Sequence, residues 1–399
     1  MSIWKEYRLD ECTEIKNGKS RPKINGTIPI YGGNGILDYC NVSNVKGETI
    51  IIGRVGAYCG SVYFENKEIW VSDNALFAKP KSDFNSKYLY YLLKQDNLNQ
   101  YAGGSSHPLL TQGRLNELKY SIPDLITQTS IAEILSSLDD KIELNNKINQ
   151  ELENLAQTLF KQWFIDFEFP NEKGEPYKSS GGEMVDSELG EIPKGWEISK
   201  ISSLEYKLQT GNRPKGGVAG ITCGIPSVGA ESVKGLGFYD FSKIKYIPLD
   251  FAEKLKRGKV DGYELLIYKD GGKPGTFMPH FTMFGEGFPF ETFFINEHVF
   301  LLDFFNKDFN SFCYFYFDSE YVKPIFENNG GKAAIPGINQ EDIKQLSIFC
   351  PSNRFVIEFG EFAKSSITRI LKNCKENQNL ADLRDALLPK LISGELEVN

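Results

Sequence analysis

Apolar residues recur at every third or fourth position between Thr127 and Phe164, in a stretch that contains neither Pro nor Gly. This spacing places them along one face of a helix. At ~1.5 Å per residue the helix would be about 57 Å long, which is typical of a coiled-coil arm. We therefore predict a long spacer helix over residues 124–168. Its apolar positions are Ile131, Ile134, Leu135, Leu138, Ile142, Ile148, Leu152, Leu155, Leu159 and Trp163.

The same pattern returns near the C-terminus. When the first helix is shifted by 228 positions, Pro123 coincides with Pro351 and Asn145 with Asn373. The residues Ile142, Leu152, Leu155 and Leu159 likewise coincide with Ile370, Leu380, Leu383 and Leu387. The chain therefore reads as a tandem duplication, with a second long helix over residues 352–399.

The rest of each half mixes short strands, helices and Gly-rich turns. Residues 1–123 predict strands at Thr49–Ile52, Ser61–Phe64 and Ala75–Lys79, and a helix at Ser86–Gln95. Residues 196–351 repeat several motifs: Arg21-Pro22-Lys23 recurs as Arg213-Pro214-Lys215, and Asp73-Asn74 aligns with Glu297-His298. Residues 169–195 are polar and rich in Gly, Ser and Pro, and we expect them to form a linker.

Composition narrows the class of protein. The 399 residues carry a net charge of −8, but residues 1–123 carry +3 and residues 124–168 carry −6. The globular regions are thus near neutral, which leaves room for local basic faces. The N-terminus carries acidic residues and lacks an apolar signal core, and no apolar run reaches membrane-spanning length. Seven Cys without a CxxC pair indicate reduced thiols, so we expect a cytoplasmic protein.

Candidate catalytic chemistry is sparse. Asn17-Gly18-Lys19-Ser20 resembles the end of a phosphate-binding loop, but Thr13 stands where that motif needs Gly. The three His residues lack the spacing of metal ligands. We therefore expect a recognition protein rather than an enzyme, with no metal or cofactor of its own.

Several motifs together resemble the specificity subunits of Type I restriction–modification systems. They are the segments Ile192–Trp196, Tyr268–Gly275 and Ile295–Phe300, the run from Leu110 to Pro123 that leads into the first helix, and the linker segment Pro176–Gly182. The resemblance implies an α+β fold with two mixed α/β target recognition domains in a tandem pseudo-symmetric repeat. Two long antiparallel coiled-coil helices would separate them.

The resemblance also implies a function. Each domain would read one half of a bipartite, asymmetric target in double-stranded DNA, and catalysis would belong to partner subunits. Two modification subunits would use S-adenosylmethionine, and restriction (translocase) subunits would use ATP with Mg. Two alternatives stay open: the recognition subunit of another nuclease–methyltransferase system, and a stand-alone DNA-binding scaffold.

Polar residues on the Gly-rich loops are the candidate DNA contacts. In the first half these are Lys19, Arg21, Lys23, Asn34, Arg54, Ser105 and His107; in the second they are Arg213, Lys215, Lys269, Lys273, His280 and Lys332. Matched pairs such as Arg21 and Arg213 are expected to contact phosphate, because base-reading residues should differ between halves.

Two predictions concern the helices. Asn145 and Asn373 interrupt the apolar stripes near mid-helix, and in an antiparallel pair they should lie close and set the register. The aromatic residues Phe160, Trp163, Phe164, Phe167 and Phe169 are expected to pack between the helix end and a domain.

Overall fold

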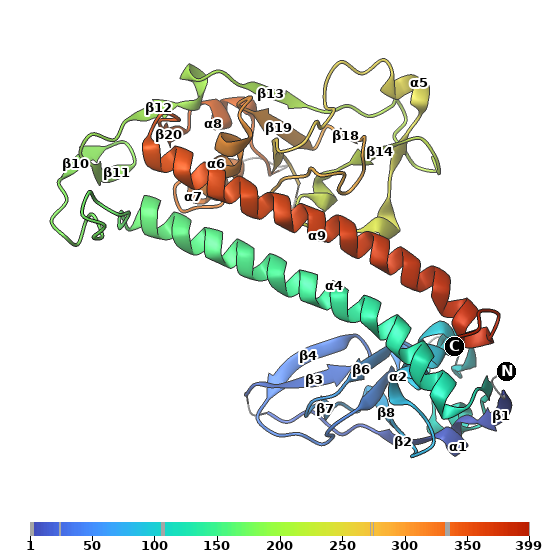
Figure 1. The fold of residues 1–399 in the computed structure, drawn as a ribbon. Coiled ribbons are helices and arrows are strands. Elements are labelled where there is room, and N and C mark those ends of the chain that lie inside the picture. The colour runs from blue at the N-terminus through green and yellow to red at the C-terminus, as the bar shows by residue number, and fades with distance from the viewer. Residues whose placement is uncertain are drawn as a thin grey trace. The chain divides into compact units, whose positions relative to one another are not determined.

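The computed structural model describes residues 4–23, 25–104, 108–271, 273, 275–331 and 336–398 (Figure 1). It divides into two compact units, residues 1–142 with 379–399 and residues 143–378. Each unit contains one globular domain and parts of both long helices. These divisions differ from the expected boundaries at 123, 168, 195 and 351, because the two ends of each helix pack on different domains.

The first unit is built on two small sheets. A four-stranded antiparallel sheet has the order β2 (Thr13–Asn17), β8 (Ala75–Pro80), β5 (Thr49–Gly53), β6 (Val62–Glu65). A three-stranded sheet has the order β4 (Gly35–Cys40), β3 (Ile28–Gly32), β7 (Trp70–Val71), in which β7 runs parallel to β3. The remaining elements are β1 (Lys5–Arg8) paired with β9 (Lys119–Ile122), and the helices α1 (Leu9–Cys12), α2 (Ser86–Gln95) and α3 (Gln112–Asn116).

Local sequence explains the core of this unit. Strand β5 is central because its three β-branched residues, Ile50, Ile51 and Ile52, are fully buried. Helix α2 begins where the Asn85 side chain accepts a hydrogen bond from the Tyr88 amide, as a helix cap does. The three predicted strands and the predicted helix are confirmed at β5, β6, β8 and α2.

The second unit repeats this architecture. Its four-stranded sheet has the order β13 (Lys207–Thr210), β19 (Val299–Asp303), β16 (Leu265–Tyr268), β17 (Phe281–Thr282). Its three-stranded sheet has the order β15 (Tyr246–Ile247), β14 (Ile225–Val228), β18 (Phe294–Ile295), with β18 parallel to β14. The other elements are β12 (Ile198–Lys200) paired with β20 (Ser347–Phe349), and α5 (Leu249–Ala252), α6 (Lys307–Phe317), α7 (Lys323–Gly330) and α8 (Gln340–Lys344).

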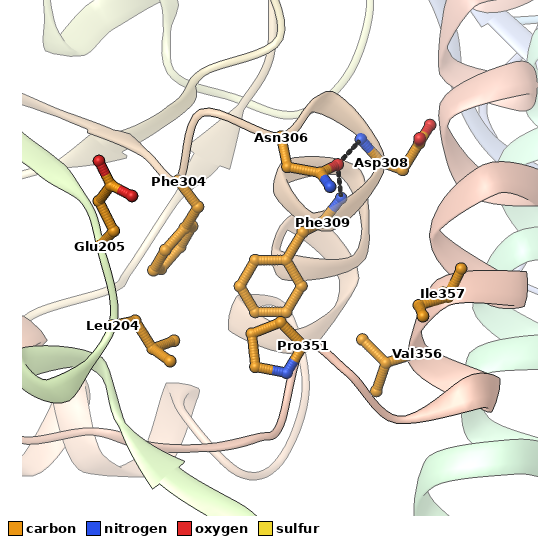
Figure 2. A pocket seen from close by; sticks show the side chains of 9 residues that line it. All are labelled: Leu204, Glu205, Phe304, Asn306, Asp308, Phe309, Pro351, Val356 and Ile357. Carbon is orange, nitrogen blue, oxygen red and sulfur yellow. Dashed lines mark hydrogen bonds between the residues drawn. The ribbon is translucent and has the colours of Figure 1, made fainter.

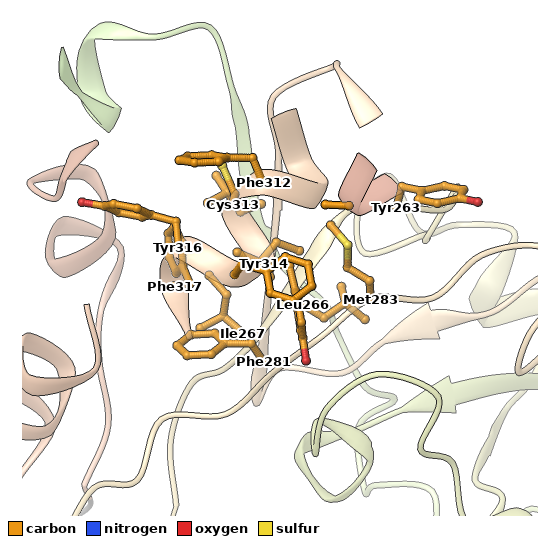
Figure 3. Close-up of a cluster of buried hydrophobic side chains, with 14 of the residues drawn as sticks. Tyr263, Leu266, Ile267, Phe281, Met283, Phe312, Cys313, Tyr314, Tyr316 and Phe317 are labelled. Carbon is orange, nitrogen blue, oxygen red and sulfur yellow. The ribbon is translucent and has the colours of Figure 1, made fainter. Parts of the chain in front are cut away.

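The core of the second unit is strongly aromatic. Helix α6 packs Phe312, Tyr316 and Phe317 close to strands β16 and β17, whose Ile267 and Phe281 lie in the same buried cluster (Figure 3). Asn306 caps this helix by accepting hydrogen bonds from the amides of Asp308 and Phe309. Helix α6 thus occupies the place in the second domain that α2 occupies in the first.

Each domain is packed by the start of its own long helix and the end of the other. Helix α4 (Leu125–Phe160) continues as a π-helical turn over Lys161–Ile165, and α9 spans Arg354–Ser393. In the first unit, Ile131, Ala132 and Leu135 of α4 share a core with Leu388, Leu391 and Ile392 of α9. In the second unit, Ala156 and Phe160 share a core with Phe359, Ala363 and Ile367.

Buried asparagines pair across the two long helices, which lie side by side in Figure 1 (α4 green, α9 red). Asn145 donates to Asn377 at 2.9 Å, and Asn373 donates to Asn149 at 2.7 Å. Partner numbers fall on α9 as they rise on α4, so the helices are antiparallel. The repeat shift carries one pair onto the other, as a pseudo-twofold axis requires.

Asn145 and Asn373 are both buried in this layer, but each bonds to the asparagine one turn along the other helix. Asn145 also donates to Glu376. The two residues therefore lie in one polar layer without bonding to one another. That this layer sets the register stays a prediction.

Residues 169–195 are more structured than a polar linker. They contain the hairpin β10 (Met184–Ser187) and β11 (Gly190–Pro193). Phe169 stacks on Tyr177 and on Trp196, with ring centroids 4.6 Å and 5.0 Å apart. The segment is thus fixed to the second domain by aromatic packing.

The expected packing of the helix-end aromatics is confirmed. Phe164 is fully buried and contacts Phe312 and Phe359, while Trp163 packs edge-on against Phe355. The end of α4 is therefore a core element of the second domain.

The seven cysteines are all unpaired, and five of them are buried. Burial raises the pKa of the Cys12 thiol to about 12 and that of Cys374 to about 11. Such thiols are packing groups with little thiolate at neutral pH. Over the described ranges, we find no helix with an apolar stretch long enough to span a bilayer.

Candidate nucleic-acid interface

In the first domain, backbone contacts bring several Gly-rich loops to one end of the sheets. The amide of Lys19, after β2, donates to Val71 at 2.9 Å, and the amide of Arg54, after β5, donates to Asn74 at 3.0 Å. The amide of Gly56 reaches the Pro108 carbonyl at 3.3 Å. Loops far apart in sequence thus form one surface, which we call the loop face of the first domain.

Close backbone approach explains the glycines of this face. A Cβ at Gly18 would stand only 1.9 Å from the Ser72 carbonyl oxygen. A Cβ at Gly33 would contact the Asn74 carbonyl, which places the neighbouring Asn34 turn on the same face. Loops packed this tightly hold side chains at fixed positions on a rigid support.

The structure brings Lys19, Asn34 and Arg54 together on this loop face. Lys19 and Asn34 are exposed, and so are Arg21 and Lys23 on the segment that follows Gly18. Arg54 is half-buried, and its Nε has no hydrogen-bond partner among the described residues. Ser105 and His107 lie outside the described residues.

The second domain forms an equivalent loop face, in which two of these backbone bonds recur. The amide of Lys269 donates to His298 at 3.0 Å, as that of Arg54 does to Asn74. The amide of Gly271 donates to Pro336 at 2.9 Å, as that of Gly56 does to Pro108. Gly211 repeats Gly18, because a Cβ there would stand 1.6 Å from the Ile295 carbonyl oxygen. The two faces are therefore copies of one scaffold.

The side chains on the second face form a continuous row of two cations, two carboxylates and one histidine. Arg213 Nε lies 2.6 Å from Glu297 Oε1, and His298 Nε2 lies 3.4 Å from the same oxygen. His298 Nδ1 is 2.5 Å from Asp270 Oδ1, and Lys269 Nζ is 3.2 Å from Asp270 Oδ2. We call Arg213, Glu297, His298, Asp270 and Lys269 the charge chain.

Sequence reasoning found the two cations of the charge chain and missed the three residues between them. A signal was present, because Glu297-His298 replaces Asp73-Asn74 at an aligned position. Unlike residues at matched places in a repeat are where recognition should differ. Asp270 carried the same signal, because Val55 at the equivalent position is apolar.

The remaining candidates of the second domain are more scattered. Lys215 and Lys273 are exposed. His280 packs against the ring of Tyr268 and lines a cavity of about 320 Å³ with Lys323 and with Glu153 of α4. Burial, together with Lys323 and Lys234, lowers the pKa of His280. Lys332 lies outside the described residues.

The two loop faces therefore differ in how their cations are compensated. Lys19, Arg21 and Lys23 have no ion pair within the part of the chain that the structure describes, whereas Arg213 and Lys269 each face a carboxylate. Free cations suit phosphate contacts, while oriented side chains suit base edges.

A second hollow on the second domain lies away from this face. It has a volume of about 300 Å³ and is lined by Leu204, Phe304, Phe309, Pro351 and Val356 (Figure 2). Phe304 follows the last residue of β19, whereas His298 precedes its first. The hollow is thus at the opposite end of that strand from the charge chain. Among the described residues, no group of three or more His, Cys, Asp or Glu could hold a metal ion.

Comparison with known proteins places this architecture. The family model for the Type I restriction modification DNA specificity domain matches residues 1–154. The specificity subunit of the Type I restriction enzyme MjaIX of Methanocaldococcus jannaschii is 31% identical over 428 aligned positions, covering 99% of this chain and 94% of the relative. The HindI specificity subunit of Haemophilus influenzae is 23% identical, covering 99% and 100%.

A solved structure has a similar fold. The S subunit of a Type I restriction-modification system from M. genitalium superposes with a TM-score of 0.59 at 15% identity, covering 98% of this chain and 96% of that chain. At this identity the likeness concerns the fold alone. The full-length relationship to the M. jannaschii subunit establishes the family: this chain belongs to the specificity subunits of Type I restriction–modification systems.

Proposed function

We propose that each domain of this non-catalytic subunit reads one half of a bipartite, asymmetric target in double-stranded DNA. One observation carries the proposal: the two loop faces share a backbone scaffold but present different side chains. A repeated scaffold with unlike readers suits two different half-sites. The paired helices would fix the separation of the two half-sites, whose short base sequences we call the first and second word.

The physical need for two readers follows from the size of a single one. A small module contacts only a few base pairs, while specific binding must compete with a vast excess of other sites. Cations such as Lys19 and Arg21 would anchor the module on phosphates, and oriented groups would read base edges in the major groove. Two short words at a fixed spacing multiply the specificity of each.

The subunit would act with partners that carry the chemistry. We expect two modification subunits, which transfer a methyl group from S-adenosylmethionine, and restriction subunits, which use ATP with Mg. The pseudo-twofold helix pair supports two copies of one partner, because it presents related surfaces twice. A cytoplasmic location fits a partner complex that works on cellular DNA.

Mapping of methylated bases tests the proposal. A restriction-deficient host expressing this chain with its modification subunit should acquire methylation at one split sequence of fixed gap. A net charge of −8 disfavours DNA binding by the free chain, so its affinity should be weak and should fall steeply with salt. Tight, specific binding by the isolated chain would instead support a stand-alone DNA-binding scaffold.

The other alternative makes a different prediction. If the chain serves another kind of nuclease–methyltransferase system, cleavage of the unmethylated site would proceed without ATP. Cleavage that needs ATP and a third subunit supports the Type I assignment. The same purified complex can be assayed with and without nucleotide.

A further inference from the structure

Arg213 forms an ion pair with Glu297 on the loop face of the second domain. Its Nε lies 2.6 Å from Glu297 Oε1, and no other ion pair of Arg213 occurs in the described part of the chain. The Arg213 side chain is 57% exposed, whereas that of Glu297 is 28% exposed. Glu297 Oε1 accepts no hydrogen bond from Arg213, so the contact is an ion pair alone. No hydrogen bond of the Arg213 guanidinium occurs among the described residues, so its NH₂ groups are available to a ligand.

The buried carboxylate of Glu297 attracts the Arg213 guanidinium electrostatically. Both of its carboxylate oxygens are buried, and neither accepts a hydrogen bond from the described residues. A buried carboxylate without compensation is costly, so the nearby cation is its main stabilising partner. His298 Nε2 lies 3.4 Å from the same carboxylate oxygen as Arg213 Nε, and His298 Nδ1 lies 2.5 Å from Asp270 Oδ1.

The backbone below Arg213 is also fixed. The Gly211 amide donates to Asn296 at 3.2 Å, and the close approach to the Ile295 carbonyl leaves no room for another residue at Gly211. The neighbouring Asn212 side chain accepts a hydrogen bond from Arg257 at 2.7 Å. Arg213 therefore projects from an ordered turn, beside the carboxylate of Glu297.

A guanidinium whose NH₂ groups make no hydrogen bond among the described residues can match one base. Its two NH₂ groups can donate together to O6 and N7 of guanine in the major groove, which is the commonest specific contact between protein and DNA. A phosphate would accept a hydrogen bond from any cationic side chain, and such a contact would not need the Glu297 ion pair to position Arg213. Lysine has the charge but cannot present a fork.

We propose that Arg213 reads a guanine in the half-site of the second domain and that Glu297 is its positioning residue. This inference rests on the proposed function and names a reader within it. It also revises the expectation that the matched residues Arg21 and Arg213 both contact phosphate. Arg21 is exposed and has no ion pair within the described ranges, so it keeps the phosphate role.

The experiment uses the complex of the full chain with its modification subunit. Methylation rates are measured on the mapped target and on duplexes with each base pair of the second half-site changed in turn. Wild type should discriminate against loss of one guanine by roughly 10- to 100-fold. Arg213→Lys should abolish that discrimination at this position alone, while the first word stays unchanged.

Matched variants separate reading from folding and from charge. Glu297→Gln should weaken the same discrimination, because Arg213 loses the ion pair that positions it. Glu291→Gln changes an exposed glutamate of the same domain and should have no effect on the discrimination. Arg21→Lys, at an expected phosphate contact, should change methylation of all duplexes by the same factor, without altering which bases are preferred. A structural role for Glu297 would alter thermal stability without altering the preferred base.

Three results would overturn the inference: a second word without guanine, unchanged discrimination in Arg213→Lys, or an equal loss of methylation on all duplexes. The last would show a phosphate contact. If the wild-type complex methylates no split sequence, the proposed function fails and the inference falls with it. If the wild-type complex methylates a split sequence and Arg213→Lys leaves the second word unaltered, the inference is refuted while the proposed function stands.

Discussion

Replacing Arg384 by methionine should loosen the end of α9 from the first domain. Arg384 Nη1 lies 2.5 Å from Asp139 Oδ1 on α4, and the Tyr91 hydroxyl of α2 donates to the other oxygen at 2.7 Å. Arg384 is 17% exposed and Asp139 28% exposed. The substitution keeps the apolar stem but leaves a largely buried carboxylate with one partner fewer.

The expected loss can be bracketed from burial. Breaking a fully buried ion pair costs about 3–5 kcal/mol, and an exposed pair contributes about 0–1 kcal/mol. An intermediate burial gives about 2 kcal/mol. For a unit of roughly 160 residues this lowers the melting temperature by about 4–8 °C.

Calorimetry together with hydrogen exchange measures the effect. Arg384→Met should lower the first thermal transition and speed amide exchange in α2 and at the end of α9. The control is Arg354→Met, which removes an exposed pair with Glu358 on the same helix and should cost under about 0.5 kcal/mol. Combining Arg384→Met with Asp139→Asn should restore part of the loss. Equal effects of Arg384→Met and the control would refute the reasoning.

Three further predictions follow from the helices and their contacts. Inserting one heptad after Ile142 and one after Gln378, where the two units meet, should lengthen the gap in methylation maps by about 3 base pairs or abolish activity; altered words would contradict this. Asn145→Leu should raise thermal stability by about 1 kcal/mol but broaden the range of methylated gaps; a single unchanged gap would argue against a register role. The hydrogen bond from Tyr263 lowers the pKa of Glu286, so this stabilisation is present at neutral pH and is lost as pH falls through the folded-state pKa. Urea unfolding of Glu286→Gln should show a deficit at pH 7 that shrinks as the pH is lowered through and below the usual glutamate range; a deficit independent of pH would refute the linkage.

The sequence predicted those features that depend on local pattern. The long helices begin just after Pro123 and Pro351, and the strands of the first domain follow runs of β-branched residues. Both signals come from residues that are neighbours in the sequence, so they can be recognised without knowledge of the tertiary fold. The repeat then carried the same reasoning from one half to the other.

Features set by contacts between residues far apart in the sequence could not be predicted from local patterns. Asn145 bonds to Asn377 rather than to Asn373, because the pseudo-twofold axis passes between helical turns. The charge chain joins Arg213 to Glu297 across a large sequence separation, and only the folded loops bring them together. The linker segment is anchored where Phe169 stacks on Trp196, a contact between residues 27 positions apart. A polar composition does not reveal such anchoring.

The central claim is that each domain reads its own half of the DNA target. It is tested most directly by replacing residues 196–351 with a second copy of residues 4–123, so that both positions carry the first domain. Methylated bases would then be mapped in a host that expresses this chain with its modification subunit. The account predicts that the first word is kept and that the second becomes the same word in inverted orientation. Retention of the original second word would contradict it.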